Sequence, residues 1–557
     1  MNLSAAIANS LWAASNVPAL RRLRRALNQP AATQLQLLHD YLEQNAQSGY
    51  GRAHGFGDIR TYDEFAHRVP LTDYDDLAPW VERIRKGEQN VLTSDAVTHL
   101  IPTSGSTGAR KLVPFTARLQ REFNRAIGPW ISDIYGQHPS VMLGPAYWSI
   151  SPVLKSKNSE PSAVPIGFED DASYLGGPRK RLVESVMAVP SKLQLVADMQ
   201  QFRYLTLLCL LRQRNLRLIS IWHPSFLSLL LDALPDCWEN LLADIHNGSC
   251  RFSDSLPESV LHALKLRPMP ARATQLGNAG PTKLESIWPL LKIISCWGDG
   301  NAELAIADLQ PLFPKTLIQR KGLIATEAFV TIPFSNSRPL AVRSHFFEFI
   351  DERGNIHLAH ELQENEMYEI VVSTGGGLWR YRLQDEVQVT GFLGKTPSLR
   401  FLGRKGNVSD RFGEKLSEVF VTNVVQELLA NISTPPCFTL LAPDENHSGC
   451  CYTLYIEGDV RQDFAALLDD LLMQNLHYAW CRKLGQLQPP RLFRINADGN
   501  ETFIAHKISD GKRVGDIKPG VLSIQAGWSD RFDGNYCSLS EPMPLQVQSA
   551  KKNPADR

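Results

Sequence analysis

Apolar and polar residues recur along the chain at two periods, which predicts both helices and strands. In the first 50 residues the apolar positions follow helical spacing, as at Leu35, Leu38 and Leu42, and a turn-rich segment follows at 48–51. The first 25 residues also read as an amphipathic helix. We therefore expect a helical unit before the first segment that carries candidate chemistry.

Between about residues 90 and 400, short apolar runs alternate with helix-like stretches. The runs include residues 141–143, 216–219 and 291–294, and the helix-like stretch 193–214 lies among them. Such alternation is typical of a sheet covered by helices. We therefore expect an α/β fold in which a large N-terminal domain contains mixed sheets and helices.

A change of pattern near residue 403 predicts a domain boundary. A strand-like run ends in the flexible sequence 401–407, and the helix-like segment 415–429 begins a new unit. That unit also contains strand-like segments at 451–456 and 491–495 and a helix-like segment at 463–475, which suits a small α+β lid. The predicted division is a large domain over 1–403, a lid domain over 404–540 and a flexible tail over 541–557.

Composition excludes several classes of function. Hydrophobic residues make up 43% of the chain and charged residues 21%, a balance that favours a globular protein. The 58 basic residues equal the 58 acidic ones, so no net charge attracts nucleic acid or an anionic membrane. The nine cysteines form no C-x-x-C pair, and no apolar run reaches the ~18 residues of a membrane span. We expect reduced thiols, a cytoplasmic location and neither a nucleic-acid nor a membrane partner.

A segment rich in hydroxyl residues and glycine carries the strongest candidate chemistry. It consists of Thr103, Ser104, Gly105, Ser106, Thr107, Gly108, Ala109, Arg110 and Lys111. Glycines let backbone N–H groups approach phosphate, hydroxyls donate hydrogen bonds to it, and a lysine adds a mobile charge. Two residues separate the second glycine from the lysine, so the segment is not a Walker A loop. The pattern predicts phosphate binding, and a solvent-exposed turn is the alternative.

Two carboxylates downstream add to this prediction. Glu327 follows the small and apolar residues 322–326, where a carboxylate can hold Mg²⁺ against a triphosphate. Asp385 follows the triple glycine 375–377 and precedes an alternating strand pattern, so we expect it at a turn, where it can accept hydrogen bonds from ribose hydroxyls. The alternatives are a solvent-facing strand-end glutamate and a turn-capping aspartate.

Aromatic residues near predicted strand ends are candidates for an acid-binding pocket. They are Tyr147, Trp148, Trp222 and Trp297. A pocket for an aryl or alkyl acid uses such side chains, although core packing is the common alternative for tryptophan and tyrosine. His223 receives no catalytic role.

The ordered series of segment 103–111, Glu327, Asp385 and Gly403–Arg404 resembles the core motifs of the adenylate-forming superfamily. Within it the chain resembles the GH3 acyl acid amido synthetases, which include plant auxin- and jasmonate-conjugating enzymes and bacterial relatives. The resemblance covers about residues 35–525. Its supporting segments are 50–56, 69–74, 87–93 and 515–519.

The resemblance implies an ATP-dependent reaction in two steps, in which an acid becomes an acyl-adenylate and an amine, such as that of an amino acid, then takes the acyl group. It implies that Thr103 to Gly108 hold the phosphates, that Lys111 lies near the pyrophosphate and that Thr326 lies near the α-phosphate. Glu327 would bind Mg²⁺ and Asp385 would bind the ribose. Arg404 would act at the ribose or hinge, and Lys518 would reach the site from the lid.

The chain departs from the plant pattern at two positions. Leu323 stands where the plant enzymes have an aromatic residue, and Gln384 stands where they usually have glycine. The resemblance therefore implies neither adenine stacking at 323 nor the plant turn before Asp385. Two other functions stay open, namely an acyl-CoA or aryl-CoA ligase with a thiol acceptor and a nucleotide-binding regulatory protein without turnover.

Overall fold

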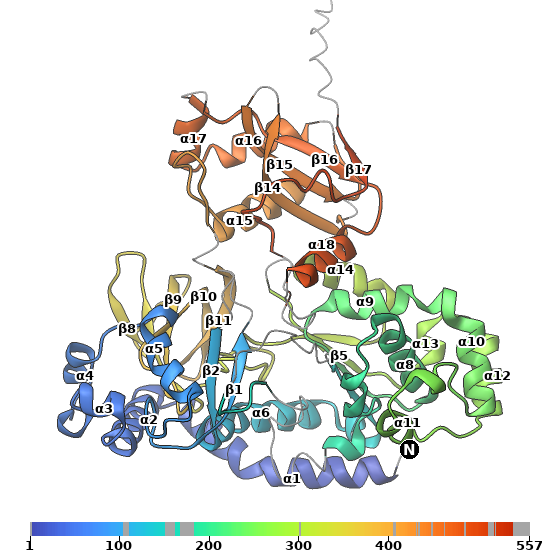
Figure 1. Cartoon of the computed structure of the whole chain (residues 1–557), viewed down its shortest axis with the longest axis horizontal. Helices are drawn as coiled ribbons and strands as arrows, with labels where there is room; N and C mark the ends of the chain where they lie inside the picture. Colours follow the sequence, from blue (N-terminus) through green and yellow to red (C-terminus); the bar gives the residue numbers. More distant parts are fainter. Residues whose placement is uncertain are drawn as a thin grey trace, which may run out of the picture.

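The structure is a computed structural model in which a smaller C-terminal unit lies above a wide N-terminal body (Figure 1). The described residues are 3–103, 111–150, 162–167, 183–299, 302–404, 408–430, 432, 435–446, 449–461, 463–483, 486–510, 517 and 520–537. The predicted tail at 541–557 lies outside them. In the part of the chain that is described, no helix has both the length and the apolar character that crossing a membrane requires.

The N-terminal segment is helical, as its periodicity predicts. Its elements are α1 (Leu3–Ala26), α2 (Pro30–Asn45), α3 (Gly49–Ala53), the 3₁₀ turn η1 (Phe56–Asp58), α4 (Tyr62–Arg68) and α5 (Tyr74–Arg85). Capping boxes begin two of them. Thr61 and Glu64 exchange side-chain and backbone hydrogen bonds at α4, and Asp73 and Asp76 do so at α5.

A four-stranded parallel sheet forms the centre of one half of the N-terminal body. Its strands, in spatial order, are β3 (Ala146–Trp148), β4 (Leu218–Ser220), β5 (Ile293–Cys296) and β6 (Leu317–Arg320). The helical elements that precede or connect them are α6 (Ala117–Gln137), η2 (Pro139–Leu143), η4 (Ser191–Leu195), α8 (Met199–Arg212), α9 (Pro224–Asp232), α10 (Leu234–Asn247), η5 (Ser253–Ser255), α11 (Glu258–Leu264), α12 (Pro270–Ala279), α13 (Leu284–Ile287) and α14 (Ala302–Leu312).

Antiparallel strands form the other half of the body. A five-stranded sheet has the order β11-β10-β9-β7-β8, and a separate hairpin pairs β1 with β2. The strands are β1 (Val97–Thr103), β2 (Lys111–Thr116), β7 (Phe346–Ile350), β8 (Ile356–Leu358), β9 (Met367–Ser373), β10 (Tyr381–Leu393) and β11 (Thr396–Arg404).

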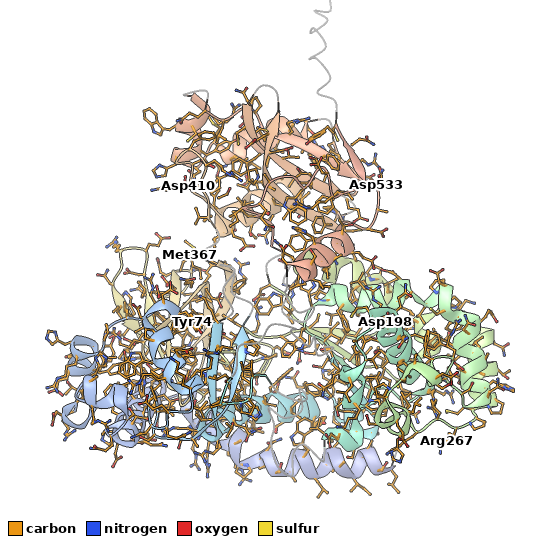
Figure 2. All side chains as sticks on the ribbon, in the orientation of Figure 1. Tyr74, Asp198, Arg267, Met367, Asp410 and Asp533 are labelled. Carbon is orange, nitrogen blue, oxygen red and sulfur yellow. The ribbon has the colours of Figure 1, made fainter. Side chains whose placement is uncertain are left out.

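The C-terminal unit has its own sheet and helices, whose side chains fill the upper part of Figure 2 between the labelled Asp410 and Asp533. Four strands pair in the order β14-β15-β16-β17, and β12 pairs with β13. The elements are β12 (Val408–Ser409), β13 (Leu416–Ser417), α15 (Glu418–Leu429), β14 (Phe438–Asn446), β15 (Gly449–Glu457), α16 (Phe464–Leu472), α17 (Leu476–Lys483), β16 (Arg491–Ile495), α18 (Gly499–Ser509) and β17 (Gly534–Tyr536).

Helix α6 lies where the two halves of the N-terminal body share a core. Its Phe123 and Trp130 belong to a buried cluster that also holds Leu218 and Ile293 of the parallel sheet and Phe329 from the segment after it. The same helix runs beneath both halves in Figure 1. Helix α6 therefore contributes to the core on both sides.

The α/β fold with a smaller C-terminal unit agrees with the sequence prediction, but one strand was misplaced. Residues 141–143 form the 3₁₀ turn η2, and the strand begins later, at Ala146. Pro139 starts this turn directly after α6, and a run of three apolar residues is too short for its period to be read. The helix-like stretch 193–214 also divides, because Asp198 caps α8 by accepting a hydrogen bond from the backbone of Gln201.

Candidate active site

The carboxyl ends of the parallel strands bring together several of the predicted residues. Strand β3 ends at Trp148, the chain after β4 continues to Trp222, and the chain after β5 continues to Trp297. Strand β6 leads directly into segment 321–327. This edge of a parallel sheet is where α/β proteins place ligands.

The four candidate aromatic residues differ in exposure. Tyr147 is completely buried, and Trp297 is 8% exposed within the core. The Trp148 ring lies 6.1 Å from the ring of Trp130 on α6. Trp222 is 42% exposed, so it is the one of the four that solvent reaches readily. The others serve mainly as packing at the strand ends.

The β1–β2 hairpin carries the ends of the predicted phosphate segment. Thr103 and Lys111 pair across the two strands, while Ser104, Gly105, Ser106, Thr107 and Gly108 lie outside the described residues. The Lys111 ammonium lies 5.7 Å from the ring centre of Tyr74, which is labelled in Figure 2. The Tyr74 hydroxyl accepts a hydrogen bond from the backbone of Leu112 at 2.8 Å.

Thr326 and Glu327 lie in a tight turn after β6. The backbone N–H of Ala325 donates to the carbonyl of Ala328 at 2.9 Å, which closes the turn around the two residues. The Glu327 side chain is 8% exposed, whereas Thr326 is half-buried. Glu327 therefore does not face bulk solvent. The alternative interpretation, a strand-end glutamate exposed to solvent, does not agree with this burial.

A buried hydrogen-bond chain connects this turn to α6. The backbone N–H of Phe329 donates to Nε2 of His345 at 3.2 Å, and Nδ1 of His345 lies 3.1 Å from a carboxylate oxygen of Glu122 on α6. Since Nε2 accepts, the ring proton is on Nδ1 and points to Glu122. The same oxygen also accepts from the backbone of Gly375 at 3.0 Å. This chain fixes the turn relative to the antiparallel sheet.

Asp385 lies inside strand β10 rather than at a turn, which corrects the sequence prediction. It pairs with Arg404, the last residue of β11. The residue before it, Gln384, has a φ of 61°, and the pairing with β9 is irregular between Arg382 and Glu386. A local bulge redirects a strand side chain without ending the strand. The Arg404 side chain lies outside what the structure describes.

Sequence reasoning missed Asp299, which connects the two sheets near this site. Its side chain is 4% exposed, forms an ion pair with Arg338, and accepts a hydrogen bond at 3.1 Å from the backbone of Phe401 on β11. Asp299 thereby fixes the end of β5 against the strand that ends at Arg404. Its place directly after the strand-end pair Trp297-Gly298 was the available signal.

Lys321 was also missed, although it is the first residue after β6. Its side chain is 5% exposed, and its ammonium donates to the carbonyl of Ile221 at 2.7 Å. Burial lowers the pKa of Lys321 to about 7. The adjacent basic residues Arg320 and Lys321, directly before the small, apolar Gly322-Leu323, were the signal in the sequence.

Comparison with protein families places these residues in a known context. The model of the GH3 family N-terminal domain matches residues 19–318, that of the GH3 family central domain matches 339–404, and that of the GH3 family C-terminal domain matches 419–526. The chain belongs to the GH3 family. The resemblance inferred from the sequence motifs is thus confirmed.

Known GH3 proteins match over nearly their full length. The chain is 28% identical to the indole-3-acetic acid-amido synthetase GH3.17 of Arabidopsis thaliana, over 95% of this chain and 98% of that protein. It is 24% identical to GH3.3 of the same plant, over 93% and 88%. The solved structure of the GH3.15 acyl acid amido synthetase shares the fold, with a TM-score of 0.79 and 21% identity over 93% and 96% of the two chains.

Two further residues that the sequence singled out in this GH3 chain are Lys518 and Leu323. Lys518 lies outside the described residues, and its neighbour Ile517 is buried within the C-terminal unit. Leu323, which replaces the aromatic residue of the plant pattern, is 2% exposed and belongs to the core between the sheets. Of the site residues predicted for this GH3 chain, the structure therefore brings Thr326 and Glu327 to the strand ends and pairs Asp385 with Arg404.

Proposed function

We propose that the chain is an ATP-dependent acyl acid amido synthetase that acts at the carboxyl ends of the parallel sheet. The carboxylate of an acid attacks the α-phosphate of ATP, which forms the acyl-adenylate and releases pyrophosphate. The amine of an amino acid then attacks the acyl carbon, which forms the amide and releases AMP. The observation that carries this proposal is the ordered match of all three GH3 domain models from residue 19 to residue 526.

Positioning and electrostatics supply the catalysis in this proposal, because both steps move charge on phosphoryl and acyl oxygens. Thr103 to Gly108 hold the phosphates, and Lys111 neutralises the pyrophosphate. Thr326 lies at the α-phosphate. Asp385 accepts from the ribose hydroxyls, and Arg404 acts at the ribose or the hinge. The pairing of Asp385 with Arg404 supports a shared role for the last two residues.

Glu327 is the proposed magnesium ligand. Among the described residues no group of three or more His, Cys, Asp or Glu side chains gathers as a metal site. A single carboxylate nevertheless suits this ion, because Mg²⁺ is commonly held by one or two carboxylates together with substrate phosphates. The ion, when bound with ATP, would offset negative charge on the phosphates. Glu327 fits this role since it is an oxygen donor fixed in a closed turn.

We further propose that the chain works as two domains that meet after residue 403, with Lys518 on the second domain completing the adenylation site. The separate sheet and core of the C-terminal unit support this division, because domains usually have a core of their own and can move relative to one another. All nine cysteines are free, which supports a reducing, cytoplasmic location.

Exchange of labelled pyrophosphate into ATP tests the adenylation step. We expect exchange that requires both a carboxylic acid and Mg²⁺ and that is independent of an amine. Exchange without an added acid, or its absence across a broad panel of aryl and alkyl acids, would contradict the proposal. An acyl-CoA ligase shares this half-reaction, so the acceptor must be identified separately from the products.

A further inference from the structure

Lys321 is a buried cation for which no carboxylate partner is present among the described residues. Its one hydrogen bond goes to a backbone carbonyl, that of Ile221. Burial lowers the pKa of Lys321, and the thiol of Cys296 acts in the opposite direction. An ammonium has three donors, and burying it without an anion is costly. Since burial lowers the pKa of Lys321 to about 7, the amine is partly neutral at that pH, and an anion that arrives with a ligand would favour its charged form.

The contacts of Lys321 reach across the strand ends to a partly exposed tryptophan. Its side chain starts after β6, passes the end of β5 and reaches the carbonyl of Ile221 after β4. Its ammonium lies 4.9 Å from the ring centre of Trp222 and 5.8 Å from that of Trp130. Trp222 is partly exposed, so a ligand that lies against this ring comes next to the ammonium.

A row of polar side chains lies on the same face of the sheet, below Lys321. Strand register places Trp148, Ser220, Ser295 and Gln319 side by side across all four strands. The amide oxygen of Gln319 accepts from Ser295 and from Trp130 on α6, both at 3.0 Å, which shows that the row faces this helix.

Two members of this row keep polar atoms without a described partner. The hydroxyl of Ser220, on a side chain that is 2% exposed, and the indole N–H of Trp148 have no hydrogen-bond partner among the described residues. Buried polar groups are rarely left in this state, because each costs free energy unless something satisfies it. Ser220 precedes Ile221, the residue that Lys321 contacts. The unsatisfied atoms and the unpaired cation thus lie at the same strand end.

We infer that the Lys321 ammonium binds the carboxylate of the acid substrate and that Trp222 covers the acid at the mouth of the site. This inference rests on the proposed function and adds to it the residue that recognises the acid. Segment 321–327 then leads from the group that holds the acid to Thr326 and Glu327, which are proposed to hold the α-phosphate and Mg²⁺.

An acid carboxylate also suits the electrostatics of Lys321. Burial lowers the pKa of the side chain, and an adjacent negative charge raises it again. The other charged group on this strand end, Arg320, forms an ion pair with Glu303 at 2.7 Å. Cys296 stays protonated at neutral pH because burial raises its pKa to about 12. Among the described neighbours Lys321 is therefore the basic group that forms no ion pair and can take up a proton when an acid carboxylate binds.

Three lysine variants separate acid binding from a structural role. Lys321→Met keeps the length of the side chain and removes the charge, whereas Lys321→Arg keeps the charge. Lys315→Met is the matched control, since that lysine has an 85% exposed side chain. For each, KM for the acid and KM for ATP are measured in pyrophosphate exchange with benzoate, indole-3-acetate and octanoate. Binding of the same acids is measured by calorimetry in the presence of a non-hydrolysable ATP analogue.

We expect Lys321→Met to raise KM and Kd for the acid by about 10- to 100-fold, because a hydrogen bond to a charged group is lost. KM for ATP should change by less than about twofold, Lys321→Arg should recover part of the loss, and Lys315→Met should match the wild type. A purely structural role would instead raise both KM values and lower the free energy of unfolding.

An unchanged KM and Kd for the acid in Lys321→Met would overturn the inference, as would an increase confined to KM for the amino acid in the complete reaction. Failure of the proposed function has a different signature. In that case the wild type binds an acid through Lys321 in calorimetry but gives no exchange. If none of the three acids binds the wild type, the inference is wrong as well.

Discussion

At the residue scale, the strand ends combine two charged side chains that burial makes costly. Glu327 and Lys321 are 8% and 5% exposed, on the same short segment after β6. Charged groups are kept inside proteins where a partner of opposite charge compensates them. In the proposed function the acid supplies such a partner for Lys321, and Glu327 binds Mg²⁺, so the two residues are where substitution should affect activity most.

Glu327→Ala and Asp385→Ala should each lower pyrophosphate exchange by about 100-fold or more, because the first removes the proposed Mg²⁺ ligand and the second removes the contact that positions the ribose. Neither change should alter the midpoint of denaturant unfolding by more than the exposed control Glu352→Ala. Full activity in both variants would show that the motif assignments are wrong. If both variants unfold, the loss of activity would be explained by a structural role of Glu327 and Asp385.

The lowered pKa of Lys321 should be visible in the pH dependence of the free energy of unfolding. Burial lowers its pKa from 10.5 to about 7, so between these values the unfolded chain binds a proton that the folded chain does not. The free energy of unfolding therefore rises with pH in this window, by at most about 1.4 kcal/mol per unit. Denaturant unfolding between pH 6 and 9.5 should show the rise in the wild type and not in Lys321→Met. Parallel curves for the two proteins would refute the lowered pKa.

At the element scale, helix α6 and the turn after β6 act as one support. Glu122 on the helix holds His345, and His345 holds the backbone of Phe329 after the turn. Glycine is required nearby, because a Cβ on Gly322 would lie 2.2 Å from the carbonyl oxygen of Thr331. The turn therefore depends on close backbone approach as well as on the hydrogen-bond chain.

Gly322→Ala tests this support against a glycine that has room. The added Cβ must displace backbone, so we expect a loss of roughly 1–3 kcal/mol in the free energy of unfolding and a fall in exchange. Gly136 on α6 has nothing within 4 Å of such a Cβ, and Gly136→Ala should gain about 0.5–1 kcal/mol through helix propensity. Equal effects of the two substitutions in denaturant unfolding would contradict the close approach at Gly322.

Sequence patterns predicted the elements better than their details. The helices at the N-terminus and strand β16 (Arg491–Ile495) follow the predicted periodicity. The prediction of a turn at Asp385 was wrong because Gln384 adopts a positive φ within a continuous strand. A positive φ is uncommon for a residue other than glycine, so the sequence does not predict it here. Asp299 and Lys321 were missed because their importance comes from partners distant in the sequence, Phe401 on β11 and Ile221 directly after β4.

At the scale of the whole molecule, the C-terminal unit touches the body at a charged surface. Arg203 on α8 lies 3.8 Å from Glu501 on α18, and α18 lies next to α14 in Figure 1. Burial, with Glu457 of the C-terminal unit nearby, raises the pKa of Asp308 on α14 to about 6. An interface of this polar kind suits domains that move relative to one another, which the proposed lid requires.

The family and the fold class could be predicted from the sequence because widely spaced motifs keep their order from segment 103–111 to Arg404. The sequence does not predict whether the acceptor is an amine or a thiol, since both attack the same acyl-adenylate. No pattern in the sequence marks how a substrate approaches between two domains.

The identity of the acylated product tests the central claim most directly. Wild-type protein is incubated with an acid that supports exchange, ATP, Mg²⁺, a mixture of the common amino acids and CoA, and the products are identified by mass spectrometry. We predict an amide between the acid and an amino acid, with one AMP and one pyrophosphate formed for each amide. A CoA thioester without any amide would contradict the account.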